Sequence, residues 1–177
     1  MSASVEEILP LLEGEEGWTR LQAPSWMGDR RQFIAGDHDP ERLMLHYFRR
    51  ESDQALMARV WLGPAAEGPP GHVHGGCLAA VLDECMGLSA WITNRPCLAG
   101  RITVEFRKPA PHGCVYTVEA VVASEEGRKL FTRARITHET GEDVAVSEGT
   151  FISMSMERLA KLAPGRVDWP LTPDSES

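Results

Sequence analysis

The chain has 177 residues, 42% hydrophobic and 25% charged, which is ordinary for a soluble domain with a sizeable core. Its net charge of −8 argues against a general nucleic-acid-binding protein. The sequence contains no apolar run of about eighteen residues, so we expect no membrane-spanning helix. Its first residues also lack the pattern of a signal peptide. The four cysteines show no C-x-x-C spacing, so we expect a reduced protein in the cytoplasm.

Residues 1–40 are expected to form an N-terminal arm that packs on the main domain. Ser4, followed three residues later by Glu7, is typical of a capping box and predicts a short helix that Pro10 interrupts. Farther along, glycines and prolines break any hydrophobic period. We expect this arm to help shape a pocket, and we identify no chemically active residue in it.

The main domain, residues 41–156, is predicted to hold two strands, then one long helix, then four more strands. A polar turn joins the first two strands, and short turns join the last four. An antiparallel sheet curled around one apolar helix satisfies this order, with the helix covered nearly all round. The predicted class is α+β, and residues 157–177 are a mostly polar tail. The predicted elements are strands 42–49 and 55–62, helix 75–92, and strands 101–107, 115–123, 130–138 and 144–154.

The helix carries a carboxylate at an unusual place. Asp83 falls in the middle of an otherwise apolar helix, where a buried carboxylate is costly unless it is paired or hydrogen-bonded. This position suggests a functional role. The alternative is that the small residues on the same face of the helix only let a sheet pack closely, with Asp83 exposed or paired. The residues that share its face are all small: Gly76, Ala79, Ala80, Gly87 and Ala90.

The start of the helix is a second candidate site. Glycines there leave backbone N–H groups uncovered, where the helix dipole favours a polarised carbonyl oxygen. Gly75 and Asp83 are eight residues apart, which is about 12 Å along one helix. A single reacting carbonyl cannot touch both. If both act on one substrate, the site must combine two copies of the helix in a dimer.

The motif formed by His74, Gly75, Gly76 and an acid nine residues after the histidine resembles hotdog-fold acyl-CoA thioesterases of the PaaI-like type. The resemblance spans roughly residues 40–155 and includes Arg101–Pro109 and Glu126–Lys129. It implies a hotdog fold and thioester hydrolysis. It also implies roles: Asp83 as nucleophile or general base, the Gly75 N–H as oxyanion donor, and His74 as the residue that holds the loop.

Other residues are expected on the substrate side of this site. We place Gly76, His72 and Glu84 there, with Glu84 in a supporting or structural role or, as an alternative, in the role of the acid. Coenzyme A carries phosphates, so local positive charge is expected. The candidates are Arg107, Lys108, Arg128 and Lys129, although solvated surface charge is the commoner role of such residues.

Two departures from the family pattern concern polar groups. Many relatives carry an Asn in the loop before His-Gly-Gly, whereas residues 63–73 contain none, although His72 could supply a polar group there. Many also carry Ser or Thr before the strand after the helix, where this chain has Ala99. A metal site using His72, His74 and Cys77 lacks a second ligand pair, so we expect no metal.

The sequence thus predicts an acyl-CoA thioesterase that acts as a homodimer or a dimer of dimers. Coenzyme A is part of the substrate, so no separate cofactor is expected, and neither nucleic acid nor membrane is an expected partner. One alternative is a hotdog module that binds acyl-CoA as a sensor without catalysis. Another is a hotdog dehydratase, but that chemistry needs a second histidine that the helix lacks.

Overall fold

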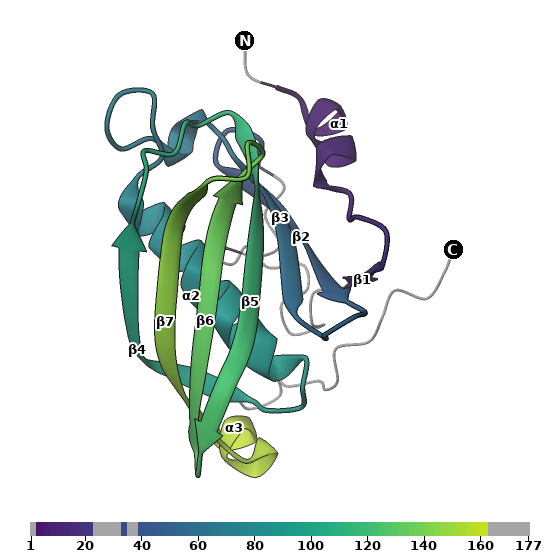
Figure 1. The fold of residues 1–177 in the computed structure, drawn as a ribbon, viewed down its shortest axis with the longest axis vertical. Coiled ribbons are helices and arrows are strands. Elements are labelled where there is room, and N and C mark those ends of the chain that lie inside the picture. Colours follow the sequence, from purple (N-terminus) through teal and green to yellow (C-terminus); the bar gives the residue numbers. More distant parts are fainter. Residues whose placement is uncertain (1–2, 23–32, 35–38, 163–177) are drawn as a thin grey trace.

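Seven strands form one antiparallel sheet in a computed structural model that describes residues 3–22, 33–34 and 39–162. Helix α2 lies across one face of this sheet (Figure 1). The strand order is β1-β2-β3-β5-β6-β7-β4, so β1 and β4 are the two edges. The strands are β1 (Trp18–Leu21), β2 (Leu43–Arg50), β3 (Leu56–Leu62), β4 (Cys97–Phe106), β5 (Cys114–Glu126), β6 (Lys129–His138) and β7 (Asp143–Ser153).

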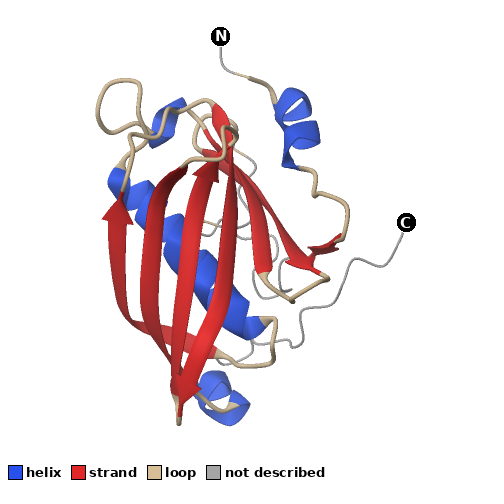
Figure 2. Ribbon diagram, viewed as in Figure 1, coloured by secondary structure: helices blue, strands red, loops and turns tan. Residues whose placement is uncertain are grey.

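The α+β hotdog fold, a curved antiparallel sheet around one long helix, is confirmed, and Figure 2 shows its two components. The alternation in β6 behaves as the sequence predicts, because its even-numbered residues Leu130 to Ile136 are buried against the core. β4 begins at Cys97, earlier than predicted. A register shift beside Gly100, between Ala99 and Arg101, interrupts the pairing of β4 with β7. The residues before this irregularity were therefore not predicted as part of the strand.

Helix α2 (Gly75–Trp91) supplies the centre of the core. Val81, Leu82, Cys85 and Met86 have no exposed surface. The sheet makes room for the helix at Gly149, where an added Cβ would lie 2.8 Å from Thr132 Oγ1 and 3.1 Å from Met86 Sδ. A buried aliphatic side chain contributes roughly 1.5–3 kcal/mol, so this contact surface is the main source of stability.

The expectation that α2 is covered nearly all round is wrong for the part of the chain that the structure describes. Gly76 is exposed, and Ala79, Ala80, Asp83 and Glu84 are only partly buried. The reason is that one sheet covers one side of a helix and leaves the opposite side uncovered. We call the partly exposed residues Gly76, Ala79, Ala80, Asp83 and Gly87 the open stripe of α2.

The N-terminal region holds one confirmed element and one that the sequence did not predict. Helix α1 (Val5–Ile8) begins with the expected capping box of Ser4 and Glu7, and the 3-10 helix η1 (Leu9–Leu12) follows. The buried side chains Ile8 of α1 and Leu12 of η1 pack with Met44 and Trp61 in a small second hydrophobic cluster. Strand β1 was not predicted. The remaining arm residues, 23–32 and 35–38, lie outside the described residues.

The C-terminal region also contains an unpredicted element. Helix α3 (Met156–Leu162) follows β7, and its Leu159 is buried in the main core. The rest of the expected tail, residues 163–177, lies outside the described residues. Among the helices that the structure describes, none has both the length and the apolar character needed to cross a membrane.

Candidate active site at the start and middle of helix α2

His74 fixes the start of helix α2. It is the N-cap residue, with extended backbone (φ −63°, ψ 132°), and its Nδ1 accepts a hydrogen bond of 2.9 Å from the Gly76 N–H. Its own N–H donates to the Ala66 carbonyl at 2.8 Å. Glycine is needed at 68 and 76, because a Cβ at either position would lie within 3.0 Å of His74. These contacts tie the preceding loop to the helix and set the direction of the first N–H groups.

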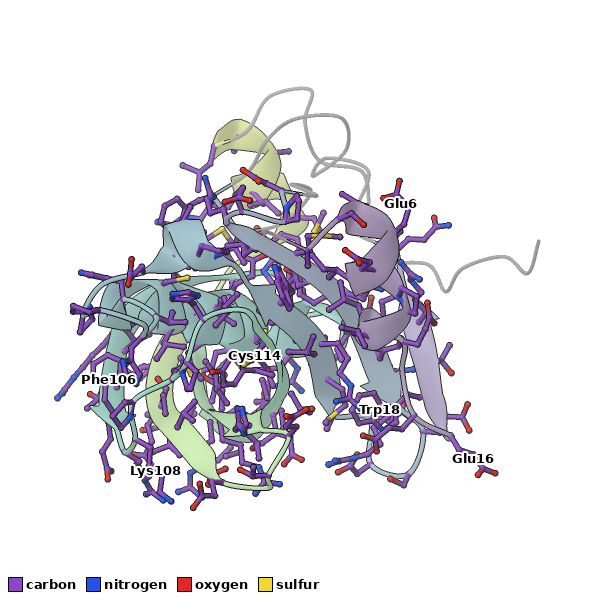
Figure 3. The ribbon with its side chains drawn as sticks, turned by 90° about the horizontal axis from the view of Figure 1, so that it is seen from above. Glu6, Glu16, Trp18, Phe106, Lys108 and Cys114 are labelled. Carbon is purple, nitrogen blue, oxygen red and sulfur yellow. The ribbon has the colours of Figure 1, made fainter. Side chains whose placement is uncertain are left out.

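Gly75 is the first residue of α2, so its N–H is one of the donors that a helix leaves without an intrahelical partner. The ring of Phe106, at the end of edge strand β4, lies over it. A Cβ at position 75 would be 3.2 Å from Phe106 Cζ. In Figure 3, Phe106 and Lys108 lie on the β4 side of the molecule and Trp18 lies at the opposite edge.

A pocket of about 410 Å³ opens beside this helix start. It brings together four residues that the sequence singled out, and Phe106 and Leu78 add an apolar wall that was not predicted. The four residues are His72, Gly75, Arg107 and Lys108. The lining of the cavity is mixed, with apolar side chains and the charged groups of Arg107 and Lys108, as expected of a site for a carrier with a polar head and an organic chain.

Asp83 lies two turns farther along, on the open stripe of α2. It is half-buried, and its Oδ1 atom is buried without a hydrogen-bond partner among the described residues. Burial raises the pKa of this carboxyl above its usual value. The thiol of Cys97, at the beginning of β4, is its titratable neighbour there. Burial and the charge of Asp83 raise the pKa of Cys97 to about 12.

Glu84 has a different environment from Asp83. It is directed towards β2, where the Tyr47 hydroxyl donates a hydrogen bond of 3.2 Å to its Oε1. Burial raises the pKa of Glu84, the Tyr47 hydrogen bond lowers it, and the charge of Asp83 raises it again. Tyr47 was not predicted as a site residue, because it lies 37 positions before Glu84 and only the packed fold brings the two together.

The four cationic candidates do not come together within one chain. Lys108 forms an ion pair with Glu142, and Arg107 contacts Glu105 at 3.2 Å. Arg128 and Lys129 are at the other end of the sheet, at the β5–β6 turn. The register shows this directly, because Lys129 and Leu98 both pair with Ile152 and therefore lie level with the start of β4.

Two further sequence expectations concern groups that a site could use. Ala99 is exposed on β4 beside the register shift, and its methyl group cannot supply the hydroxyl found in many relatives. For a metal, the residues described contain no group of three or more His, Cys, Asp or Glu side chains able to hold an ion. His74 Nδ1 is already engaged as the helix cap.

Comparisons with known proteins find a family and relatives that this chain resembles. Residues 70–145 match the family model of the thioesterase superfamily. The chain is 35% identical over 89 residues to acyl-coenzyme A thioesterase THEM4 of Xenopus laevis, covering 50% of this chain and 40% of that protein. The chain therefore spans less than half the length of this curated relative.

Solved structures show the same fold. A crystal structure of a thioesterase superfamily protein superposes with a TM-score of 0.58 at 26% identity, covering 61% of this chain and 53% of that one. The PaaI protein of the Escherichia coli phenylacetic acid degradation operon superposes with a TM-score of 0.55 at 17% identity. That match covers 57% of this chain and 73% of PaaI.

Proposed function

We propose, from the match of residues 70–145 to the thioesterase superfamily, that the chain is an acyl-CoA thioesterase with Asp83 at its reactive centre. One observation supports this above the others. Asp83 keeps a buried carboxylate oxygen without a partner among the described residues, on the only side of α2 that the sheet leaves uncovered. A carboxylate held in this way incurs the cost of burial and stays available for a substrate.

Asp83 can act in two ways on a thioester. As a nucleophile, its oxygen attacks the carbonyl carbon, the C–S bond breaks, the thiolate leaves, and water then hydrolyses the mixed anhydride. As a general base, it removes a proton from the water that attacks the carbonyl. In both routes, negative charge develops on the carbonyl oxygen, and the Gly75 N–H at the positive end of α2 is suited to receive it.

The distance between these two groups favours a site shared by two copies of the chain. Gly75 and Asp83 are about 12 Å apart along one helix. Phe106, at the end of β4, lies against Gly75. Cys97, at the start of β4, lies beside Asp83, and its thiol donates a hydrogen bond of 3.9 Å to the Gly87 carbonyl. β4 is an edge strand of the sheet. Antiparallel pairing of two β4 strands about a two-fold axis therefore places one copy's Gly75 near the other's Asp83.

The same pairing brings the separated cations towards one end of the assembly. The start of β4, level with Lys129, is then beside the end of β4 in the second copy, which is followed by Arg107 and Lys108. The phosphates of coenzyme A are a suitable ligand for such a combined group of charges. A dimer, alone or within a dimer of dimers, would thus complete both the reacting centre and the carrier site.

A second candidate function is a module that binds acyl-CoA without hydrolysing it. The observation in its favour is Ala99, which has no hydroxyl to hold water at the position where many relatives carry Ser or Thr. Release of free thiol from a panel of short, long and aromatic acyl-CoAs separates the two functions. Turnover supports the thioesterase, whereas tight binding of an acyl-CoA without turnover supports the binding module.

A further inference from the structure

A second, partly buried acid lies beside the reactive centre, and the mechanism above does not use it. The Glu84 carboxylate accepts a hydrogen bond of 3.2 Å from the hydroxyl of Tyr47, whose side chain is only 5% exposed. Burying the carboxylate of a glutamate against a strand is unfavourable unless it is paired or hydrogen-bonded. Tyr47 provides that pairing and fixes the carboxylate in one position.

The position of Glu84 makes it an electrostatic neighbour of Asp83. The two residues are consecutive, so their Cα atoms are about 3.8 Å apart, and their side chains diverge by about 100° around the helix. Glu84 is therefore too differently directed to replace Asp83 at a shared substrate atom. The adjacent positions are near enough for the charge of each acid to act on the other, and the charge of Asp83 raises the pKa of Glu84.

The other groups around this pair leave the interaction intact. Tyr47 from β2 and Cys85 from α2 face Glu84, and Cys97 from β4 faces Asp83. Burial raises the pKa of all three above its ordinary value, so they remain neutral near pH 7. Among the described residues, no ion pair neutralises either acid. The Tyr47 hydrogen bond favours the ionised form of Glu84.

During either route of thioester hydrolysis, Asp83 loses its negative charge, to a proton or to the bond that it forms. A nearby negative charge favours that loss. We propose that Glu84, held by Tyr47, is a positioning residue whose negative charge makes Asp83 a stronger base or nucleophile. This inference rests on the proposed thioesterase function, and it assigns to Glu84 and Tyr47 a part in setting the rate.

The kinetic test compares Glu84→Gln, which keeps an acceptor for Tyr47 but removes the charge, with Glu84→Asp and Tyr47→Phe. The expected kcat of Glu84→Gln at neutral pH is lower by roughly tenfold, with KM little changed and partial recovery in Glu84→Asp. Tyr47→Phe should shift the rise of kcat to higher pH and equal the wild type at alkaline pH. Glu148→Gln, on the outer face of the sheet, is the matched control.

Two kinetic results overturn the proposal. A Glu84→Gln variant with the wild-type kcat and pH profile shows that the Glu84 charge has no effect. A Glu84→Gln variant as inactive as Asp83→Asn shows that Glu84 carries the chemistry itself. A purely structural role is also distinguishable, because it lowers the unfolding midpoint without moving the pH profile.

A measurement without turnover separates this proposal from the thioesterase assignment. In a carbon-13 NMR titration, the Glu84 carboxyl midpoint should fall in Asp83→Asn and rise in Tyr47→Phe. An unchanged Glu84 midpoint in Asp83→Asn overturns the inference even if the wild type hydrolyses acyl-CoA. Absence of turnover in the wild type refutes the thioesterase, and the titration then decides alone whether the two acids are coupled.

Discussion

Gly75 and Phe106 are in such close contact that a Cβ on Gly75 would lie 3.2 Å from the Phe106 ring. The contact joins the first turn of α2 to the end of edge strand β4. Gly75 lines the same pocket as Phe106, Arg107 and Lys108. The consequences of this arrangement can be measured.

Replacing Gly75 by proline tests the oxyanion role of its N–H. Position 75 is the first of the helix, where proline is tolerated, and the extended backbone of His74 suits a residue before proline. Gly75→Ala adds a similar Cβ near Phe106 but keeps the N–H. We expect kcat of Gly75→Pro to fall about 10²–10³-fold below that of Gly75→Ala, measured by thiol release. Equal rates in the two variants would exclude this donor.

A mixture of inactive variants tests whether two chains share each site. Asp83→Asn and Gly75→Pro should each be inactive as pure proteins. After unfolding and refolding together, half of randomly formed dimers are mixed, and each has one intact site of its two. We therefore expect roughly a quarter of the wild-type activity. No recovery in mixtures shown by mass spectrometry to contain mixed dimers would place both groups in one chain.

The raised pKa of Asp83 predicts how stability depends on pH. Because burial raises the pKa of this acid in the folded protein, the unfolded chain ionises it first, and folding loses stability as the pH rises through the folded value. Asp83→Asn should therefore be more stable than the wild type at pH 7. Urea unfolding should show this gain shrinking towards zero below the ordinary pKa of aspartate.

Asp53 provides a control of opposite sign for that experiment. Its ion pair with Arg50 lowers its pKa to about 2, so Asp53→Asn should lose stability at pH 7 and less of it in acid. If Asp83→Asn behaved like Asp53→Asn, with a loss at pH 7, the carboxylate of Asp83 would have a stabilising partner, contrary to the site described above.

The His74 cap is expected to matter for the stability of α2. His74→Ala removes the acceptor of the Gly76 N–H and should lower the free energy of unfolding by about 0.5–2 kcal/mol in urea. Asparagine is among the best N-cap residues, so His74→Asn should keep most of that stability. Equal losses in the two variants would mean that the cap contributes little and that other His74 contacts dominate.

Much of the fold could be predicted because hydrophobic period and turn residues are local signals. The long apolar run after two glycines marked α2, and alternation marked β6. Strand β1 was missed because Trp18–Leu21 is short and is defined by its pairing with β2, with Trp18 opposite Arg50. The open side of α2 was missed because burial of a helix depends on how much surface the single sheet covers.

The candidate site was predictable only in part for a similar reason. The motif located His74, Gly75 and Asp83, but tertiary contacts place Tyr47 against Glu84 and Phe106 against Gly75. These pairs are 37 and 31 positions apart in the chain, so no local pattern marks them. The pairing of Lys108 with Glu142 has the same origin, and it shows why cationic residues alone did not locate a phosphate site.

The most direct test of the account is the rate of thiol release by Asp83→Asn, with Asp53→Asn as a matched control in the distant β2–β3 turn. On the acyl-CoA of the panel that is hydrolysed fastest, we predict that kcat/KM falls about 10²–10⁴-fold in Asp83→Asn, while Asp53→Asn keeps the wild-type rate. A folded Asp83→Asn protein that hydrolyses the same acyl-CoA within a few-fold of wild type would contradict the central role of Asp83.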